Sequence, residues 1–172
     1  TAEKTRSSGL LIPSTGNSNK KGRRITQTFY LVLGRSADIA FSEDYFSKRG
    51  FGHRTVFRTR PNPSTSLEFD WYFLDDRKHQ GGTSFNGTAE TKLPHDFRAV
   101  ADFNLVSSFT FRQVFSDNFT TATRPTDNSR VFLTKNYRSR SFNLLFSQEE
   151  TVFPGQNVII RNTPSLSFKI LG

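Results

Sequence analysis

Apolar and polar side chains alternate with a period of two residues along most of the chain. The clearest case runs from Phe97 to Leu105, where every odd position is apolar and three of the four even positions are polar. Successive side chains of a β-strand point to opposite faces, so this pattern predicts a strand with one apolar and one charged face. A strand of this length, when tilted, is also long enough to cross a bilayer.

The same alternation recurs in short runs that are separated by turn residues. It predicts strands at residues 25–33, 38–46, 54–60, 67–73, 84–92, 97–105, 109–115, 130–133, 138–146, 157–161 and 165–170. Short polar connections join neighbouring runs, as in β-hairpins. No stretch shows the 3.6-residue period of an amphipathic helix over a useful length. We therefore predict an all-β chain of antiparallel, up-and-down strands, about ten or eleven in number.

The first 24 residues differ from the rest of the chain. A short apolar run at residues 10–12 is stopped by Pro13, and residues 14–22 are rich in Ser, Asn, Lys and Gly, which is typical of a loop. We expect residues 1–24 to form a junction or loop with the start of a first barrel strand, and residues 25–172 to form an incomplete β-barrel segment. The chain contains no Met, so we interpret it as a processed product or a piece of a larger protein.

Composition narrows the classes of function. The formal net charge is +9, 34% of the residues are hydrophobic, 19 are Phe and none is Cys. The absence of Cys excludes disulfides, Cys-based zinc sites and thiol nucleophiles. The positive charge favours an anionic partner such as nucleic acid, phosphate or lipopolysaccharide. No apolar run approaches the length of a membrane helix, but barrel strands alternate and give only weak hydropathy peaks.

Alternation alone fits either a soluble β-sandwich or a membrane barrel. Long runs, full charges on successive polar faces and aromatic residues near strand ends favour the barrel. We predict that the apolar face contacts lipid and the polar face lines a lumen. The predicted lumen-facing residues are Glu68, Asp70, Glu90, Lys92, Arg98 and Asp102. The predicted lipid-facing residues are Leu67, Phe69, Trp71, Phe73, Phe97 and Phe103.

The sequence carries no arrangement of residues typical of an active site. His53, His79 and His95 are isolated and lack the spacing of a zinc motif. Asp75 and Asp76 are sequence neighbours, which on a strand would point apart and make a poor catalytic pair. We therefore expect no catalytic residues, no cofactor and no metal, and a protein that is not an enzyme.

An ordered set of motifs lies within the first 50 residues. It consists of R-x-S-G-x-L-I-P at residues 6–13, Phe29 with Tyr30, Ala37 with Asp38, Tyr45, and Arg49 with Gly50. In this order the motifs resemble the LptD family of lipopolysaccharide-assembly proteins, also called organic solvent tolerance proteins. The resemblance implies a region that joins a periplasmic β-jellyroll to the opening strands of a large barrel in the outer membrane of a Gram-negative bacterium.

The resemblance also implies a function and partners. Family members insert lipopolysaccharide into the outer leaflet through the barrel lumen and a lateral gate between the first and last strands. An LptE-type lipoprotein fills the lumen, and the jellyroll docks on an LptA-type periplasmic bridge. Gly9 and Pro13 match the family's first barrel strand, where a proline removes a ladder hydrogen bond from a seam that opens. A second family proline is replaced here by Gln27 and Thr28.

Two other functions fit parts of the pattern. The chain could belong to another outer-membrane barrel, such as a porin or a transporter. It could also be a soluble basic β domain that binds an anionic polymer. Nucleic-acid binding would need aromatic and basic side chains on one exposed face. Here aromatic and basic residues mostly alternate along a strand and so point to opposite faces, as Phe97 and Arg98 illustrate. We therefore expect no nucleic-acid partner.

Overall fold

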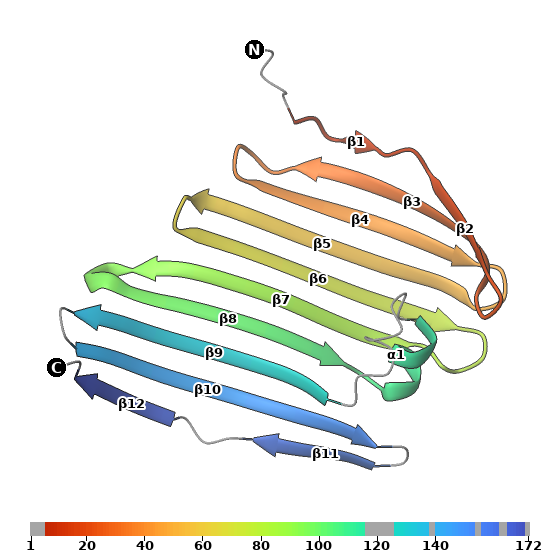
Figure 1. The fold of residues 1–172 in the computed structure, drawn as a ribbon. Helices are drawn as coiled ribbons and strands as arrows, with labels where there is room; N and C mark the ends of the chain where they lie inside the picture. Colours follow the sequence, from red (N-terminus) through yellow and green to blue (C-terminus); the bar gives the residue numbers. More distant parts are fainter. Residues whose placement is uncertain (1–5, 116–125, 138–139, 154–155, 162–164, 171–172) are drawn as a thin grey trace.

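Most of the described chain lies in one antiparallel β-sheet. The computed structural model describes residues 6–115, 126–137, 140–153, 156–161 and 165–170 (Figure 1). The strands are β1 (Gly9–Leu10), β2 (Ser14–Ser18), β3 (Gly22–Val32), β4 (Ala37–Phe46), β5 (Gly50–Asn62), β6 (Thr65–Asp76), β7 (Gly82–Leu93), β8 (Phe97–Val106), β9 (Thr126–Tyr137), β10 (Arg140–Phe153), β11 (Gln156–Arg161) and β12 (Ser165–Ile170). The only helical elements among these residues are the 3₁₀ turn η1 (Pro94–Asp96) and the helix α1 (Phe109–Phe115).

Strands that follow each other in the chain are neighbours in the sheet. From β3 to β10 each strand pairs antiparallel with the next, while β1 and β2 both pair with β3, and β11 and β12 both pair with β10. The first and last strands therefore lie at opposite edges of the sheet (Figure 1). The prediction of an all-β, antiparallel up-and-down chain is confirmed.

The pairing register assigns each side chain to one of two faces. Residues directly opposite each other on paired strands share a face, so the register extends a row across many strands. One row is formed by Phe29, Phe41, Thr55, Trp71, Phe85 and Leu105. A row on the other face is formed by Asp38, Arg58, Glu68, Thr88, Asp102 and Arg130. We call these the aromatic face and the charged face.

The aromatic face is not covered by any described residue. The buried apolar residues of the described chain are Phe46, Leu74, Phe111 and Phe115, and all four belong to one cluster between α1 and one end of the charged face. In contrast, 44% of Trp71 on the aromatic face is exposed. A β-sandwich would bury this face against a second sheet, and no second layer is present among the described residues.

Residues 109–115 form a helix, so the prediction of a strand there is wrong. The hydroxyl of Ser108 accepts a hydrogen bond from the backbone N–H of Phe111 at 3.1 Å, which caps the first turn. Phe111 and Phe115 lie one helical turn apart and pack on the sheet, Phe111 against Tyr72 and Phe115 against Phe46. A helix places both rings on the same side, where both are buried against the sheet. This burial favours the helix over the strand that the alternating pattern predicted.

The prediction of a loop at residues 14–22 is also wrong for Ser14–Ser18, because these residues form β2. These residues are polar on both sides, so they carry no alternating signal. They are held instead by backbone pairing, with Ser14 opposite Thr26 and Ser18 opposite Gly22. Strand β3 accordingly begins at Gly22, three residues before the predicted start.

Arg49 connects three turns at the end of the sheet where α1 lies, and Gly50 allows a close backbone approach beside it. Gly50 has a φ of 130°, and a Cβ at this position would lie 2.3 Å from the carbonyl oxygen of Asp75, so a larger residue is excluded. The guanidinium of Arg49 is buried and donates to Asp76 at 3.1 Å, to Gln80 at 2.6 Å and to the carbonyl of Lys20 at 3.2 Å.

Substitution Phe111→Ala tests whether α1 is held by its apolar contacts. Removal of a buried Phe side chain costs about 3–5 kcal/mol. In the full-length protein we expect α1 to leave the sheet, with its amide exchange at least about tenfold faster by hydrogen-exchange mass spectrometry. Gln113→Ala, on the exposed side of the same helix, is the control, and equal exchange in both variants would contradict the packing described above.

Candidate functional site

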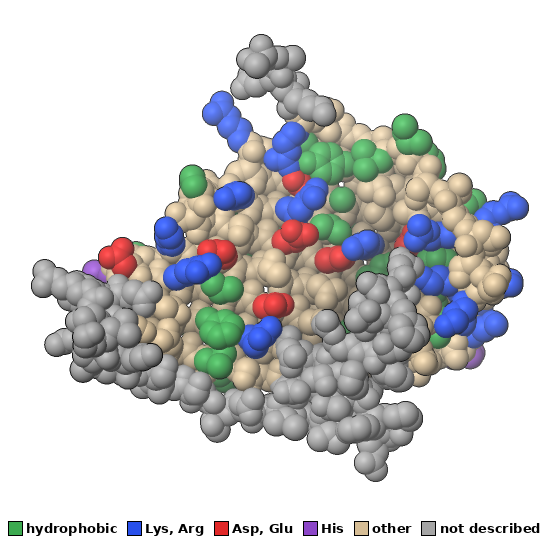
Figure 2. Space-filling model, viewed as in Figure 1, with side chains coloured by type: hydrophobic (Ala, Val, Ile, Leu, Met, Phe, Trp, Pro, Cys, Tyr) green, Lys and Arg blue, Asp and Glu red, His purple; other side chains and the backbone are tan. Residues whose placement is uncertain are grey.

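The six residues predicted to line a lumen all lie on the charged face. Register places Glu68 in one row with Asp102, Lys92 opposite Arg98, Asp70 opposite Asn86 and Glu90 opposite Val100. Figure 2 shows this face, with Lys and Arg interspersed with Asp and Glu.

Ion pairs connect neighbouring strands across the charged face. Nε of Arg54 donates to Asp70 at 2.9 Å, and Arg98 pairs with Glu90 at 2.8 Å. The side chains involved are exposed by between 23% and 57%, so each pair contributes little to stability. Their main effect is to keep this face strongly polar.

The six residues predicted to face lipid lie together on the opposite, aromatic face. None of Leu67, Phe69, Trp71, Phe73, Phe97 and Phe103 is buried. Aromatic rings of this face contact each other along the surface: Trp71 stacks on Phe73 with centroids 6.5 Å apart, and Phe69 stacks on the neighbouring Phe85 with centroids 5.7 Å apart. On this largely apolar face the side chains therefore pack sideways against each other rather than against a second layer of described residues.

A polar pair, missed in the sequence, interrupts the aromatic face. Glu43 and His53 are directly opposite each other on β4 and β5, and Nδ1 of His53 lies 2.7 Å from the Glu43 carboxylate. The His53 ring stacks on Phe73. Both residues are odd-numbered, like most aromatic residues of these two strands, which is the signal that could have placed them on the aromatic face. That they lie opposite each other follows only from the pairing of β4 with β5.

The edge strand is broken between Leu10 and Ser14, with Gly9 just before the break and Pro13 within it. Gly9 is opposite Tyr30 in β1, and after the break β2 resumes with Ser14 opposite Thr26. Three residues, 11–13, thus lie opposite two residues of β3, which is a bulge-like irregularity. Pro13 has no N–H to donate, so the ladder loses a bond at this point. We call residues 11–13 the first-strand break.

Gln27, which stands where the family's second proline is expected, contacts the first-strand break. Its side-chain amide donates to the carbonyl oxygen of Leu11 at 2.8 Å, and the N–H of Leu11 donates to the carbonyl of Thr28 at 2.8 Å. The side chain of β3 therefore supplies a hydrogen bond that the interrupted backbone ladder lacks. A proline at this position could not provide it.

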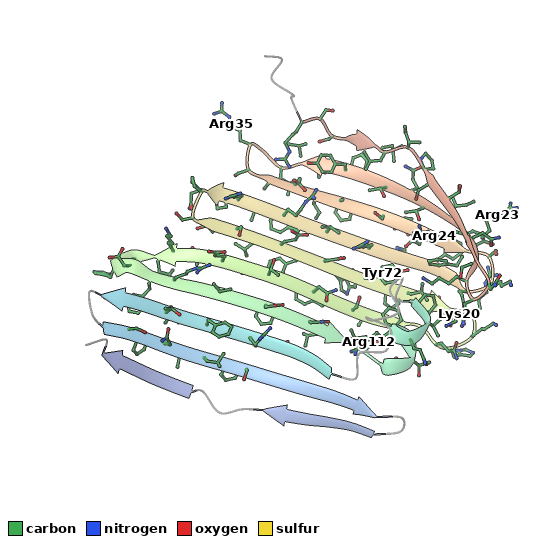
Figure 3. All side chains as sticks on the ribbon, viewed as in Figure 1. Lys20, Arg23, Arg24, Arg35, Tyr72 and Arg112 are labelled. Atoms are coloured by element: carbon green, nitrogen blue, oxygen red, sulfur yellow. The ribbon has the colours of Figure 1, made fainter. Side chains whose placement is uncertain are left out.

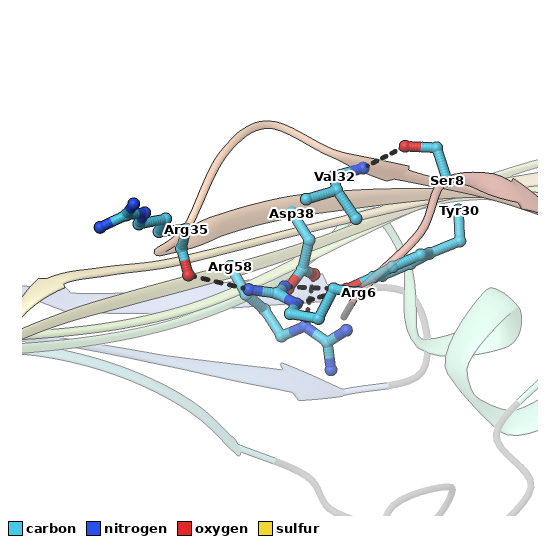
Figure 4. Close-up of polar contacts among 7 residues, drawn as sticks. All are labelled: Arg6, Ser8, Tyr30, Val32, Arg35, Asp38 and Arg58. Carbon is cyan, nitrogen blue, oxygen red and sulfur yellow. Dashed lines mark hydrogen bonds and ion pairs between the residues drawn. The ribbon is translucent and has the colours of Figure 1, made fainter. Parts of the chain in front are cut away.

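A second set of contacts holds the chain just before β1 (Figure 4). Asp38 is buried, and it pairs with Arg6 through one carboxylate oxygen and with Nε of Arg58 through the other, at 2.9 Å. Arg6 also donates to the Tyr30 hydroxyl, at 2.8 Å from Nη2, and Ser8 accepts from the N–H of Val32 at 2.8 Å. We call Arg6, Tyr30, Asp38 and Arg58 the Asp38 cluster.

The cluster favours the charged form of Arg6. The hydrogen bond to Tyr30, assisted by the nearby Asp38 carboxylate, raises the pKa of Arg6 above its ordinary value. An arginine is a cation at every working pH even without such a shift, so the shift reflects how closely Arg6 is bound and does not decide its charge. The sequence analysis included Arg6 and Asp38 in the same set of motifs but did not predict that they form an ion pair. That ion pair depends on the pairing of both β1 and β4 with β3.

Basic residues also gather at both ends of the sheet. Figure 3 shows Lys20, Arg23, Arg24 and Arg112 at the end where α1 lies, and Arg35 at the opposite end. Lys20 is in the turn between β2 and β3, whereas Arg23 and Arg24 belong to β3, and the neighbouring Lys21 donates to the carbonyl of Phe115 at 3.1 Å.

The described residues contain no group of three or more His, Cys, Asp or Glu side chains that could hold a metal ion. In the same part of the chain, no helix is both long and apolar enough to cross a membrane.

Substitution Gln27→Leu tests the hydrogen bond at the first-strand break. Loss of one exposed hydrogen bond costs about 1 kcal/mol, so amides of residues 9–12 should exchange about fivefold faster in the full-length protein, as measured by hydrogen-exchange mass spectrometry. Gln113→Leu is the matched control on α1. Unchanged exchange at residues 9–12 would show that the Gln27 amide does not stabilise the edge.

Comparisons with known proteins agree with the motifs in the first 50 residues. A family model described as "LptD protein" matches residues 1–170. The chain is similar to three proteins named "LPS-assembly protein LptD". That of Sodalis glossinidius is 37% identical over 51% of the chain, that of Nitrosospira multiformis 32% over 69%, and that of Shewanella sp. strain MR-4 25% over 72%.

The matched segment is a small part of these relatives, since it covers 11%, 13% and 16% of their respective lengths. The family match, in contrast, extends over almost the whole chain, and it confirms the resemblance that the ordered N-terminal motifs indicated. The chain belongs to the LptD protein family.

Proposed function

We propose that this chain is part of an outer-membrane translocon that inserts lipopolysaccharide into the outer leaflet of a Gram-negative bacterium. The aromatic face would contact lipid, and the charged face would line a water-filled lumen. The observation that carries this proposal is the uncovered aromatic face, which lies directly opposite a face of ion pairs on the same strands. Exposed apolar surfaces of this extent mark sites that contact a membrane or another protein.

The dimensions of the strands support the membrane interpretation. Strands β3 to β10 contain 10 to 14 residues each. A membrane strand needs about 9–11 residues when it is tilted, whereas soluble strands usually have about 5–6. The aromatic residues then lie where lipid tails and the membrane interface would contact them.

The first-strand break supports a lateral gate at this edge. Gly9 and Pro13 lie where β1 and β2 fail to form a continuous strand, and Gln27 provides one of the bonds that hold the break to β3. An edge with fewer backbone hydrogen bonds separates at lower cost, which suits an exit for lipid between the first and last strands.

We propose the domain limits and partners that the family resemblance implies. Residues 1–24 would join a periplasmic jellyroll to the first barrel strand, and residues 25–172 would form an incomplete barrel segment. An LptE-type lipoprotein would occupy the lumen, and an LptA-type bridge would deliver lipopolysaccharide through the jellyroll. The mixture of charges on the face opposite the aromatic residues provides a polar surface for such a plug and for the sugars of the cargo.

The LptD family is not a family of enzymes, which confirms the prediction that the chain has no enzymatic activity. A porin or transporter would share the two faces, and a lipopolysaccharide assay on the full-length protein separates these functions from the proposed one. A soluble domain that binds an anionic polymer is disfavoured, because its aromatic and basic residues would need to share a face. Here Phe97 and Arg98 lie on opposite faces.

The full-length protein should require detergent to remain in solution. Removal of detergent exposes the aromatic face to water, and we expect aggregation within the time of a size-exclusion run. A monomeric peak with β-type circular dichroism in detergent-free buffer would contradict the membrane interpretation.

Phe103→Arg and Asp102→Asn test the assignment of the two faces. Phe103 lies in the middle part of β8 on the aromatic face, where an Arg should cost about 2–4 kcal/mol if the face contacts the bilayer midplane. Asp102, the adjacent residue on the charged face, should tolerate Asn at less than about 1 kcal/mol. Denaturant unfolding of both full-length variants in lipid bilayers measures the difference, and equal costs would refute the assignment.

A further inference from the structure

The Asp38 cluster has more positive than negative charge. Elsewhere on the charged face, the ion pairs of the described residues join one guanidinium to one carboxylate, as in Arg54 with Asp70. At Asp38, two guanidinium groups share a single carboxylate. Asp38 is only 6% exposed and both of its oxygens are engaged, so it cannot neutralise both arginines.

This cluster borders a cavity of about 660 Å³ on the charged face. We call it the basic pocket. Its charged lining residues are Arg6, Arg35, Arg58, Arg60, Asp38 and Glu68, which leaves an excess of two positive charges. The hydroxyl-bearing residues Ser36, Ser66 and Thr88 also line it. The volume is within the range of small-molecule sites, about 300–1,000 Å³.

Arg58 and Arg60 have guanidinium N–H groups that are available to a ligand of the pocket. Asp38 engages only Nε of Arg58, and in Figure 4 the terminal nitrogens of Arg58 point away from that carboxylate. Arg60 makes one long bond, 3.4 Å from Nη2 to the carbonyl of Pro63. Asp38 holds Arg58 in place before any ligand arrives, so less side-chain entropy is lost on binding.

We propose that the basic pocket binds the phosphate group of a phosphorylated sugar. A phosphate monoester carries close to two negative charges at neutral pH, which matches the excess charge of the pocket. Planar guanidinium groups bind phosphate in a bidentate manner, and the hydroxyl groups suit a sugar. The inference rests on the proposed function for the source of the phosphate, which would be the phosphorylated sugars of lipopolysaccharide.

Binding by the full-length protein in detergent tests this site. The probes are a glycolipid with two sugar phosphates, the same glycolipid after phosphatase treatment, and inorganic phosphate. The double variant Arg58→Gln/Arg60→Gln removes the available donors. The matched control is Arg54→Gln, on the same strand and face but outside the pocket lining. Circular dichroism and thermal unfolding confirm that both variants are folded.

We expect the double variant to bind the phosphorylated glycolipid at least about tenfold more weakly than the wild type, with the control within twofold. Binding of the phosphatase-treated glycolipid should be the same in all three proteins. If inorganic phosphate binds and the glycolipid does not, and the double variant loses that binding, the phosphate site is supported and its source is free phosphate.

Two results would overturn the site. One is glycolipid binding by the double variant within twofold of the wild type. The other is an equal loss of binding for the phosphatase-treated glycolipid, because the recognised group would then not be phosphate. Lipopolysaccharide assembly by the wild-type protein is measured separately. The phosphate site can therefore be refuted while the proposed function is supported, and the proposed function can be refuted while the phosphate site is supported.

Discussion

The structure depends on one continuous ladder of backbone hydrogen bonds between antiparallel neighbours. Each strand from β3 to β10 pairs with the next, and the one register shift recorded among these pairs lies at the end of β5, between Thr59 and Asn62. The alternation along each strand therefore extends across the paired part of the sheet. Most aromatic residues of the paired strands are thereby gathered on one surface and most charged residues on the other, with Glu43 and His53 among the exceptions. The buried apolar cluster of the described residues lies at one end of the sheet, so along most of their length the strands are positioned by pairing with their neighbours.

The departures from this regular pattern occur at the ends and at one edge of the sheet. At one end, α1 places Phe111 and Phe115 on the charged face, where they form the main buried apolar cluster of the described residues with Phe46 and Leu74. Arg49 connects three turns beside this cluster. These contacts fix the positions of the turns at that end, which the ladder alone leaves less constrained.

At the edge, backbone bonds are partly replaced by side-chain bonds. The first-strand break removes ladder bonds around Pro13, and Gln27, Ser8 and the Asp38 cluster attach the same segment to β3 and β4. Side-chain contacts can be exchanged for contacts with water or a ligand at lower cost than a continuous ladder. An edge held in this way is suited to a seam that opens, and the basic pocket lies beside it.

The sequence by itself determined the all-β class and the separation of the aromatic and charged residues, because side-chain parity on a strand is a local property. It also indicated the family, through the ordered motifs in the first 50 residues. Residues such as Phe103 and Asp102 could be assigned to faces without any knowledge of their neighbours. Tertiary structure decided the contacts that join distant segments: Arg6 to Asp38, Gln27 to Leu11, and Glu43 to His53. It also decided that residues 109–115 form a helix, because Phe115 packs against Phe46 and Phe111 against Tyr72, both on strands far earlier in the chain. Such contacts depend on which strands pair and in what register, and the spacing of residues along one strand does not specify either.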